Sequence, residues 1–420
     1  MHFEPRFLSP FHLAALSIAL ILAGCGGDGG ADSGSSGAKV TGAVTPTPTS
    51  TSTTTGVFVP PPTCVNIATL PTWRQGMAIG QWKQLASADI SQVTPTVVPG
   101  GITGYRARIE AWNGFAADVV NNVLYLGATG GHTDYAGNEV YTLDLNLATP
   151  QWVIRQQPSP ASAYLDDKPY YSDGRPTSTH TYYTAWFIEQ RAKFFKFSGG
   201  ATWGPTGGGG TPHIDSWDPV TNAWDAAGTN PDMGLSPTVE SPTAKNFLTG
   251  DVYQLLFNDH LYRWNQQTNS VTDLGDAEAG GHTFYDFNKS PSVVDTKNNR
   301  LLFLSDVAHA GAARVYNLSA KTWASQNITG PAASEVSKAE SQGMAYFDSC
   351  ADKIVYKSTS GGMVYLVDPT TLNATILPTS GAAIPDPPTG VHTLFQYLPK
   401  LGGYAYQPTH GSKLYFLATQ

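Results

Sequence analysis

The chain has 420 residues, of which 13% are charged and 11% aromatic, and it contains 43 glycines and 30 prolines. Its formal net charge is −8 and no basic patch or stripe stands out, which argues against a nucleic-acid partner. Short alternating apolar runs bounded by Gly, Pro, Asn and Asp recur, whereas helical periodicity is rare, so the composition predicts an all-β domain.

The N-terminus carries the pattern of a secretion signal. An apolar run over residues 13–22 follows Arg6 and ends in Leu22-Ala23-Gly24-Cys25, and it is too short to stay as a membrane-spanning helix. This pattern resembles a bacterial lipoprotein signal peptide over residues 1–24. The resemblance implies that Cys25 becomes the first mature residue and carries fatty acyl chains, palmitate among them, that anchor the protein to a membrane. The alternative is an ordinary cleaved signal with an incidental cysteine.

Two features extend this interpretation. Gly26 and Gly27 follow the cysteine where an aspartate would oppose export to the outer membrane, so we expect an outer-membrane location on the periplasmic or the surface face. Residues 25–62 consist largely of Gly, Ser, Thr and Pro, with too few apolar side chains to offset the entropy cost of folding. We expect a disordered tether there and a folded domain over residues 63–420.

Lipidation of Cys25 leaves two cysteines, Cys64 and Cys350. In an oxidising compartment they are expected to form a disulfide that fastens the start of the domain to a segment near its end. The alternative is two unrelated thiols.

The clearest repeat unit covers residues 114–157 and divides into four strands. The predicted strands are residues 114–120, 123–129, 139–145 and 151–155, with a Gly130-Gly131 doublet after the second and Trp152 in the fourth. Weaker copies follow every 40 to 60 residues or so, as blades of a propeller do. The last copy stops after three strands.

This pattern resembles a kelch-type β-propeller, the fold that includes the propeller of galactose oxidase, over residues 82–418. We predict six blades, or seven if residues 158–177 contain strands. Gly80 to Ala86 is expected to pair with Leu414 to Leu417 and to close the ring as the outer strand of the last blade. Copper radical chemistry of the galactose oxidase kind is rejected, because no free cysteine remains for its cross-linked tyrosine.

Loops that a kelch arrangement sends to one rim are rich in histidine and tyrosine, and a rigid ring of such loops forms a concave site. The predicted acid/base residues are His132, Tyr135, His180, Tyr182 and His282. The predicted substrate contacts are Arg106, Arg108, Trp112, His309 and His392. A divalent metal ion held by His132, Asp134 and His180 is a further prediction, although their spacing matches no recognised metal motif.

These residues suit β-elimination on a uronic-acid polysaccharide, in which a cation neutralises the carboxylate while His or Tyr moves protons. Hydrolysis would need paired carboxylates, for which Asp134, Glu139, Glu240 and Asp286 are candidates. Two alternatives stay open. The rim could bind a glycan or another envelope protein without catalysis, and the recurring His-Thr pairs could be structural features of each blade.

Overall fold

The computed structural model describes residues 63–205, 210–234, 239–277, 283, 287–306 and 310–420. The predicted signal peptide, Cys25 and the predicted tether lie outside the described residues, as do His282, Asp286 and His309. None of the helices in the described part of the chain has the length and apolar character needed to cross a membrane.

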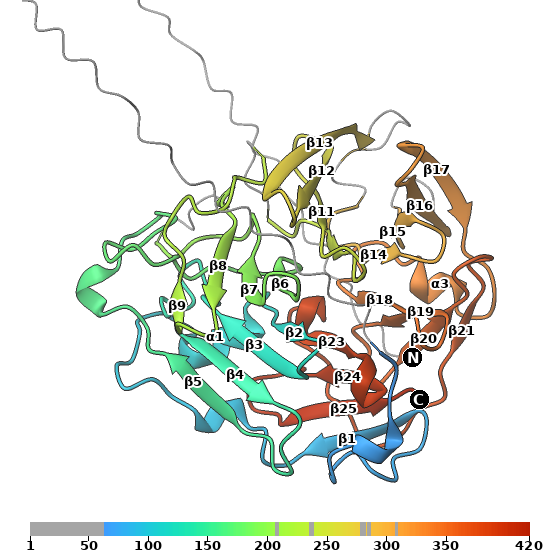
Figure 1. The fold of residues 1–420 in the computed structure, drawn as a ribbon, viewed down its shortest axis with the longest axis horizontal. Helices are drawn as coiled ribbons and strands as arrows, with labels where there is room; N and C mark the ends of the chain where they lie inside the picture. The colour runs from blue at the N-terminus through green and yellow to red at the C-terminus, as the bar shows by residue number, and fades with distance from the viewer. Residues whose placement is uncertain (1–62, 206–209, 235–238, 278–282, 284–286, 307–309) are drawn as a thin grey trace, which may run out of the picture. The chain divides into compact units, whose positions relative to one another are not determined.

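Six small sheets form a six-bladed β-propeller, as predicted (Figure 1). Five sheets have four antiparallel strands each. Blade 1 contains β2 Ala116–Asp118, β3 Val123–Gly127, β4 Val140–Asp144 and β5 Trp152–Gln156. Blade 2 contains β6 Ala185–Ile188, β7 Lys193–Lys196, β8 Asp215–Asp218 and β9 Ala223–Trp224. Blade 3 contains β10 Thr243–Lys245, β11 Val252–Leu255, β12 His260–Asn265 and β13 Ser270–Asp276. Blade 4 contains β14 Ser292–Asp295, β15 Arg300–Phe303, β16 Ala312–Asn317 and β17 Thr322–Asn327. Blade 5 contains β18 Met344–Asp348, β19 Lys353–Lys357, β20 Val364–Val367 and β21 Ala374–Ile376.

The sixth blade joins the two ends of the domain. It contains β23 Phe395–Leu398, β24 Gly403–Tyr406, β25 Leu414–Ala418, β1 Gln81–Leu85 and β22 Ser380–Gly381. Strand β1 pairs antiparallel with β25, with Trp82 opposite Leu417 and Leu85 opposite Leu414, which confirms the predicted ring closure. Figure 1 shows the blue β1 beside the red β25. The short β22 adds a parallel fifth strand that was not predicted.

Helical segments are short and lie in the connections. They are α1 Ala107–Glu110, α3 Ala333–Val336, and the 3-10 turns η1 Ile67–Thr69, η2 Ile90–Gln92, η3 Gly104–Arg106, η4 Ala161–Ala163, η6 His392–Leu394 and η7 Pro399–Leu401. Residues 158–177 contain η4 and no named strand, so they do not add a seventh blade.

The turn between the first two strands of a blade shows why these sequences form hairpins. In blade 1 the Asp118 carboxylate accepts hydrogen bonds from the backbone N–H groups of Val120 and Asn121, both at 2.9 Å. Asn122 then adopts φ 55°, a left-handed conformation that asparagine tolerates better than most residues. Blade 4 repeats this turn with Asp295 and Asn299.

The N-terminal segment is fastened to the end of the chain. Cys64 and Cys350 form the predicted disulfide, with Cα atoms 5.6 Å apart. The Arg74 guanidinium donates hydrogen bonds to the backbone carbonyls of Leu401 at 2.7 Å and of Gln420 at 2.7 Å. The disulfide thus holds the start of the domain against the β18–β19 turn of blade 5, and Arg74 holds it against blade 6.

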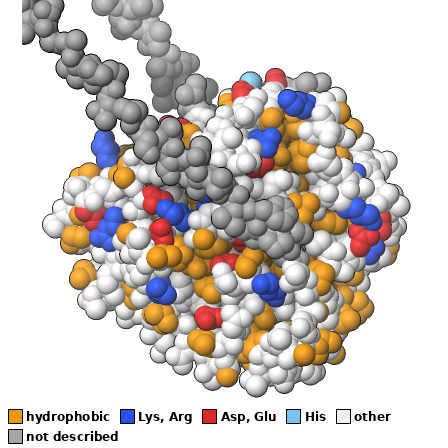
Figure 2. All heavy atoms as spheres, in the orientation of Figure 1, with side chains coloured by type: hydrophobic (Ala, Val, Ile, Leu, Met, Phe, Trp, Pro, Cys, Tyr) orange, Lys and Arg blue, Asp and Glu red, His pale blue; other side chains and the backbone are white. Residues whose placement is uncertain are grey.

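Aromatic side chains from the inner strands fill the centre of the ring. Trp186 on β6 and Tyr346 on β18 lie with ring centroids 6.1 Å apart, and Phe247 lies 6.0 Å from Tyr346 and from Tyr397. The Lys245 ammonium lies over the Phe247 ring and pairs with Glu189 at 3.0 Å. The two faces of the propeller are therefore separated by packed side chains. On the face shown in Figure 2, acidic and basic side chains are interspersed.

Candidate functional site

Besides Glu340 in blade 5, one non-glycine residue in each of the six blades adopts a left-handed backbone conformation two to four residues before the inner strand. These residues are Trp112, Tyr182, Glu240, Lys289, Gln342 and His392, with φ values of 50°, 42°, 60°, 62°, 49° and 44°. Residues of these types rarely adopt this conformation, which costs about 1 to 3 kcal/mol each. Such strained residues cluster at functional sites, and here they recur with the symmetry of the ring.

Backbone hydrogen bonds link these strained residues to one another. Tyr182 N–H donates to the Trp112 carbonyl at 2.8 Å, and Gln342 N–H donates to the Lys289 carbonyl at 3.0 Å. The Gln342 carbonyl accepts from His392 N–H at 3.3 Å, and Thr393 N–H donates to the Tyr182 carbonyl at 3.3 Å. These bonds tie the segments together on the face that also bears the loop between β3 and β4.

A pocket of about 750 Å³ lies on this face. Its lining comes from all blades except the sixth: Trp112, His132, Asp134, His180, Tyr182, Ala201, Val239, Glu240, Lys289 and Gln342. The volume falls within the range of small-molecule pockets.

Glycine doublets position the two histidines of this pocket. A Cβ atom on Gly131 would come within 2.4 Å of the His180 backbone nitrogen, and one on Gly200 within 1.8 Å of the His180 carbonyl oxygen. Both glycines have positive φ. The close approach lets the Ala201 carbonyl accept hydrogen bonds from the backbone N–H groups of His132 at 3.2 Å and His180 at 3.3 Å.

Asp134, His180 and Tyr182 form a chain of polar contacts. His180 Nε2 lies 3.1 Å from Asp134 Oδ2, and His180 Nδ1 lies 3.4 Å from the Tyr182 hydroxyl. With Nε2–H donated to the carboxylate, the lone pair of Nδ1 faces the phenol. In such an arrangement the carboxylate orients the imidazole, and the imidazole can then act as a base that accepts the proton of the hydroxyl.

The surroundings shift the pKa values of this chain in opposite directions. Burial alone would raise the pKa of Asp134, but hydrogen bonds from His180 and Thr103 outweigh it and the net shift is downward. Burial, with the charges of Glu240 and Asp134, raises the pKa of Tyr182 well above its usual value. At neutral pH Asp134 is therefore an anion and Tyr182 a neutral phenol.

His132 stands beside this chain. Its ring lies 6.0 Å from the His180 ring and nearly parallel to it, and its Nδ1 contacts the Thr133 hydroxyl at 3.1 Å. Trp112 also packs against His180, with ring centroids 5.3 Å apart. The aromatic face of Trp112 is a surface on which a sugar ring can stack.

The opposite side of the pocket carries a cation and an amide. Lys289 Nζ lies 3.6 Å from a Glu240 carboxylate oxygen and 3.5 Å from one of Glu340. Burial raises the pKa of Glu240, and the charge of Lys289 only partly offsets it. Gln342 adds a side-chain amide with both donors and acceptors.

Several predicted site residues lie elsewhere. Tyr135 is 0% exposed and donates its hydroxyl to Glu139 at 2.7 Å, beneath the loop that carries His132. This pairing also removes Glu139 from the pocket. Tyr135, predicted as an acid/base residue, therefore does not line the pocket, and its hydroxyl is bonded to a buried carboxylate.

The predicted arginine clamp is also absent from the pocket. Arg108 is 1% exposed and contacts the Tyr141 hydroxyl and His410 Nε2, the latter at 2.8 Å. Arg106 is exposed and pairs with Glu110 at 2.7 Å. Neither lines the pocket, where Lys289 supplies the cation instead.

His392 lies below the pocket rather than in it. It is fully buried against the rings of Tyr182 and Tyr183, at 5.5 and 5.0 Å, so it cannot contact substrate directly as predicted. The Thr residues of two His-Thr pairs are structural: Thr181 Oγ1 accepts from Gly114 N–H at 2.9 Å, and the Thr393 hydroxyl donates to the Tyr182 carbonyl at 3.2 Å. The alternative of a structural role thus holds for the threonines.

The metal prediction finds no support in this geometry. His132, Asp134 and His180 are neighbours, but His180 Nε2 and Asp134 Oδ2 face each other in a hydrogen bond and do not converge on a common point. Among the residues that the structure describes, no group of three or more His, Cys, Asp or Glu side chains is arranged to hold a metal ion. The predicted divalent ion at the channel mouth is not proposed further.

Sequence analysis missed Lys289 and Gln342. A signal for Lys289 exists, because Glu240-Ser241-Pro242-Thr243 and Lys289-Ser290-Pro291-Ser292 are copies of one motif that leads into β10 and β14. Aligning the blades on this motif would have placed both charged residues at one rim.

Comparison with known proteins identifies no family for this chain. No protein-family model matches the chain, and no curated protein matches it. Among the solved structures that match is the crystal structure of a nidogen/laminin complex, over 64% of this chain and 85% of that chain, with 12% sequence identity and a TM-score of 0.36. A likeness at this level carries no argument about function, so the function is inferred from the pocket alone.

Proposed function

We propose that the protein is an enzyme that cleaves an acidic polysaccharide by β-elimination in the pocket around His180. The observation that carries this proposal is the Asp134–His180–Tyr182 chain, which shares one pocket with Lys289 and Gln342. Elimination next to a uronate needs a group that moves protons and a group that holds the carboxylate, and the two sides of the pocket supply them.

In the proposed reaction the Tyr182 oxygen removes the proton from C5 of the uronate while its own proton passes to His180 Nδ1. The Asp134 carboxylate stabilises the imidazolium that forms. The C4–O bond then breaks as a C4=C5 double bond forms. Tyr182 gives its newly acquired proton to the leaving oxygen and recovers one from His180, so both groups return to their starting state.

Lys289 and Gln342 are assigned the role of binding the substrate carboxylate. The negative charge on this carboxylate grows as C5 loses its proton. Trp112 is assigned to stack on a neighbouring sugar ring.

Hydrolysis is a second candidate, favoured by one observation. The pKa of Asp134 is lowered and that of Glu240 raised, and two carboxyl groups tuned apart are the usual arrangement of glycoside hydrolases. Both oxygens of Asp134 already accept hydrogen bonds, from Thr103 and His180, and for this reason we place elimination first.

The test is an assay of the purified protein on a panel of uronate-containing and neutral polysaccharides, with near-ultraviolet absorbance and reducing ends both measured. Elimination produces an absorbing unsaturated end with every cleavage. We expect His180→Ala to lower the rate at least hundredfold with no change in thermal unfolding. His213→Ala is the matched control, because His213 also pairs with an aspartate, at 2.7 Å from Asp232, but does not line the pocket.

The other outcomes are equally informative. Reducing ends without absorbance would identify a hydrolase, and Asp134→Asn and Glu240→Gln should then both abolish cleavage. Saccharide binding without any product would overturn catalysis and favour a non-catalytic glycan-binding or protein-binding lipoprotein. An equal loss in His180→Ala and His213→Ala would contradict the assignment of His180.

We further propose that the domain acts at the cell envelope as a lipid-anchored protein of kelch type. Support comes from the signal pattern that ends at Cys25, and from Gly130-Gly131 and Gly199-Gly200, which recur at corresponding positions after the second strands of blades 1 and 2. An anchored enzyme with its pocket on one face would meet polymers outside the cell, or in the periplasm.

A further inference from the structure

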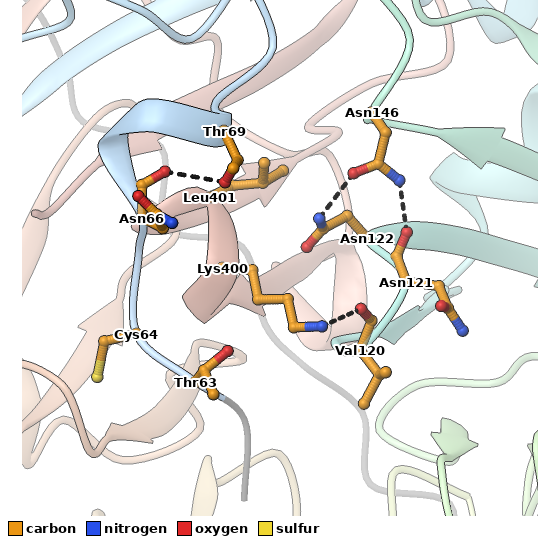
Figure 3. A pocket seen from close by; sticks show the side chains of 10 residues that line it. All are labelled: Thr63, Cys64, Asn66, Thr69, Val120, Asn121, Asn122, Asn146, Lys400 and Leu401. Atoms are coloured by element: carbon orange, nitrogen blue, oxygen red, sulfur yellow. Dashed lines mark hydrogen bonds between the residues drawn. The ribbon is translucent and has the colours of Figure 1, made fainter.

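A second pocket, of about 500 Å³, lies on the opposite face of the propeller (Figure 3). The β2–β3 turn supplies Asn121 and Asn122, the segment after β4 supplies Asn146, the β23–β24 turn supplies Lys400, and the N-terminal segment supplies Asn66 and Thr69. These turns are at the strand ends opposite to the loop that carries His132. The packed aromatic centre separates the two pockets.

Hydrogen bonds fix the amide orientations in this pocket. Asn146 Nδ2 donates to the Asn121 carbonyl at 2.7 Å and to Asp144 Oδ1 at 2.9 Å, so Asn146 Oδ1 must be the atom that faces Asn122. Asn122 Nδ2 donates to that oxygen at 2.8 Å. The orientation of Asn122 follows, since flipping its amide would place two oxygens against each other.

The side-chain oxygen of Asn122, Oδ1, is a buried hydrogen-bond acceptor that receives no hydrogen bond from the described part of the chain. The residue is 7% exposed. In Figure 3 the amide extends from its turn toward the side of the pocket that carries Asn66 and Lys400. A buried polar atom without a partner is unfavourable by about 1 to 3 kcal/mol, so a ligand that donates a hydrogen bond here gains affinity.

The remaining polar groups that line this pocket indicate which class of ligand it can bind. The lining contains no carboxylate, and its polar side chains are amides and hydroxyls apart from Lys400. The Lys400 ammonium donates to the Val120 carbonyl at 2.6 Å and has two further hydrogens. A simple anion has no hydrogen to give to Asn122, whereas a sugar hydroxyl can donate to Asn122 and accept from Lys400 at once.

We infer that this pocket is a second binding site, specific for a neutral saccharide whose hydroxyl donates to Asn122 Oδ1. The inference does not depend on the proposed lyase activity, because the two pockets share no residue. One wall of the site is the N-terminal segment, which the Cys64–Cys350 bridge holds in place.

The experiment is calorimetric titration of the full chain with neutral disaccharides built from glucose, galactose, mannose or N-acetylglucosamine. We expect one of them to bind, with a Kd that varies little with salt because the ligand is uncharged. Asn122→Gly should weaken this binding about tenfold, the loss expected for one neutral hydrogen bond to a buried group. Glycine preserves the turn, since it adopts the positive φ of Asn122 without strain.

Asn299→Gly is the matched control, because Asn299 occupies the same turn position in blade 4, with φ 51°, and does not line this pocket. It should leave the Kd unchanged, and so should His180→Ala. Absence of binding by every neutral disaccharide would overturn the inference, as would equal losses in the two glycine variants. Binding lost in His180→Ala but kept in Asn122→Gly would assign the saccharide to the first pocket and leave only the proposed function standing.

Discussion

Single residues in this propeller have separable chemical and structural tasks. His180 pairs with Asp134 in the pocket, whereas the hydroxyl of its neighbour Thr181 accepts a hydrogen bond from the backbone N–H of Gly114, just before the inner strand of blade 1. The same His-Thr sequence at residues 392–393 leaves a histidine that is fully buried with neither ring nitrogen bonded in the described structure. A repeated dipeptide therefore does not predict a repeated function, because its depth in the ring differs from blade to blade.

The buried His392 gives a prediction about pH. Burial lowers its pKa to about 3, and nearby His180 adds to the shift. The unfolded chain, with a histidine pKa near 6.5, binds a proton between about pH 6.5 and 3 that the folded chain does not. The free energy of unfolding should therefore fall as the pH drops through this window.

Calorimetric melting between pH 4.5 and 7.5 tests the predicted fall in stability at low pH. His410 adds to the same trend, since burial and then Arg108 lower its pKa to about 4. His392→Asn should have a shallower dependence of Tm on pH than the wild type, whatever its absolute stability. A variant with the wild-type slope would show that His392 does not contribute.

At the scale of elements, closure of the ring depends on segments far apart in sequence. Strand β1 completes the blade formed by β23 to β25, and the Cys64–Cys350 bridge joins the segment before β1 to the β18–β19 turn. Trp82 and Leu85 of β1 are buried in the main core cluster. The N-terminal segment is thus part of the fold and also the wall of the second pocket.

Removing the disulfide should destabilise the domain substantially. The bridge joins residues 286 positions apart, and the chain-entropy model assigns about 5 to 6 kcal/mol to a loop of that length. Cys64→Ser, Cys350→Ser and the double variant should lower the free energy of unfolding by equal amounts in urea titrations. Additive losses would contradict a shared bridge, and a reductant should affect only the wild type.

At the scale of the whole molecule, the sequence predicts a lipid anchor at Cys25. Changing Cys25→Ser should abolish lipidation, because the acyl chains attach to the cysteine sulfur, and should shift the protein from the membrane to the soluble fraction. Detergent partition and fractionation of cells measure this. Saccharide binding and cleavage by the released protein should be unchanged, and a variant that stays in the detergent phase would contradict the anchor.

Much of this architecture could be predicted from short stretches of the sequence. Alternating apolar runs, turns and glycine doublets define the strands and hairpins of each blade through contacts between residues near in sequence, so the six blades were predicted correctly. The pairing of β1 with β25 joins the two ends of the domain, and it was predicted because the last copy of the repeat lacked a fourth strand. Counting cysteines led to the disulfide. The loops of a propeller emerge at fixed faces of the ring, so a shared rim was predicted for five residues that line one pocket: Trp112, His132, Asp134, His180 and Tyr182.

Only the tertiary structure decided what each loop residue touches. Tyr135 and Tyr182 are both tyrosines in rim loops, but one hydroxyl is buried on Glu139 and the other faces His180. Arg108 is held inside by Tyr141, while Lys289, two blades beyond Tyr182 in chain order, reaches the pocket. The partners of both tyrosines are near in sequence, but which of the two hydroxyls faces the pocket depends on how neighbouring blades pack around each loop, and no local pattern contains that information.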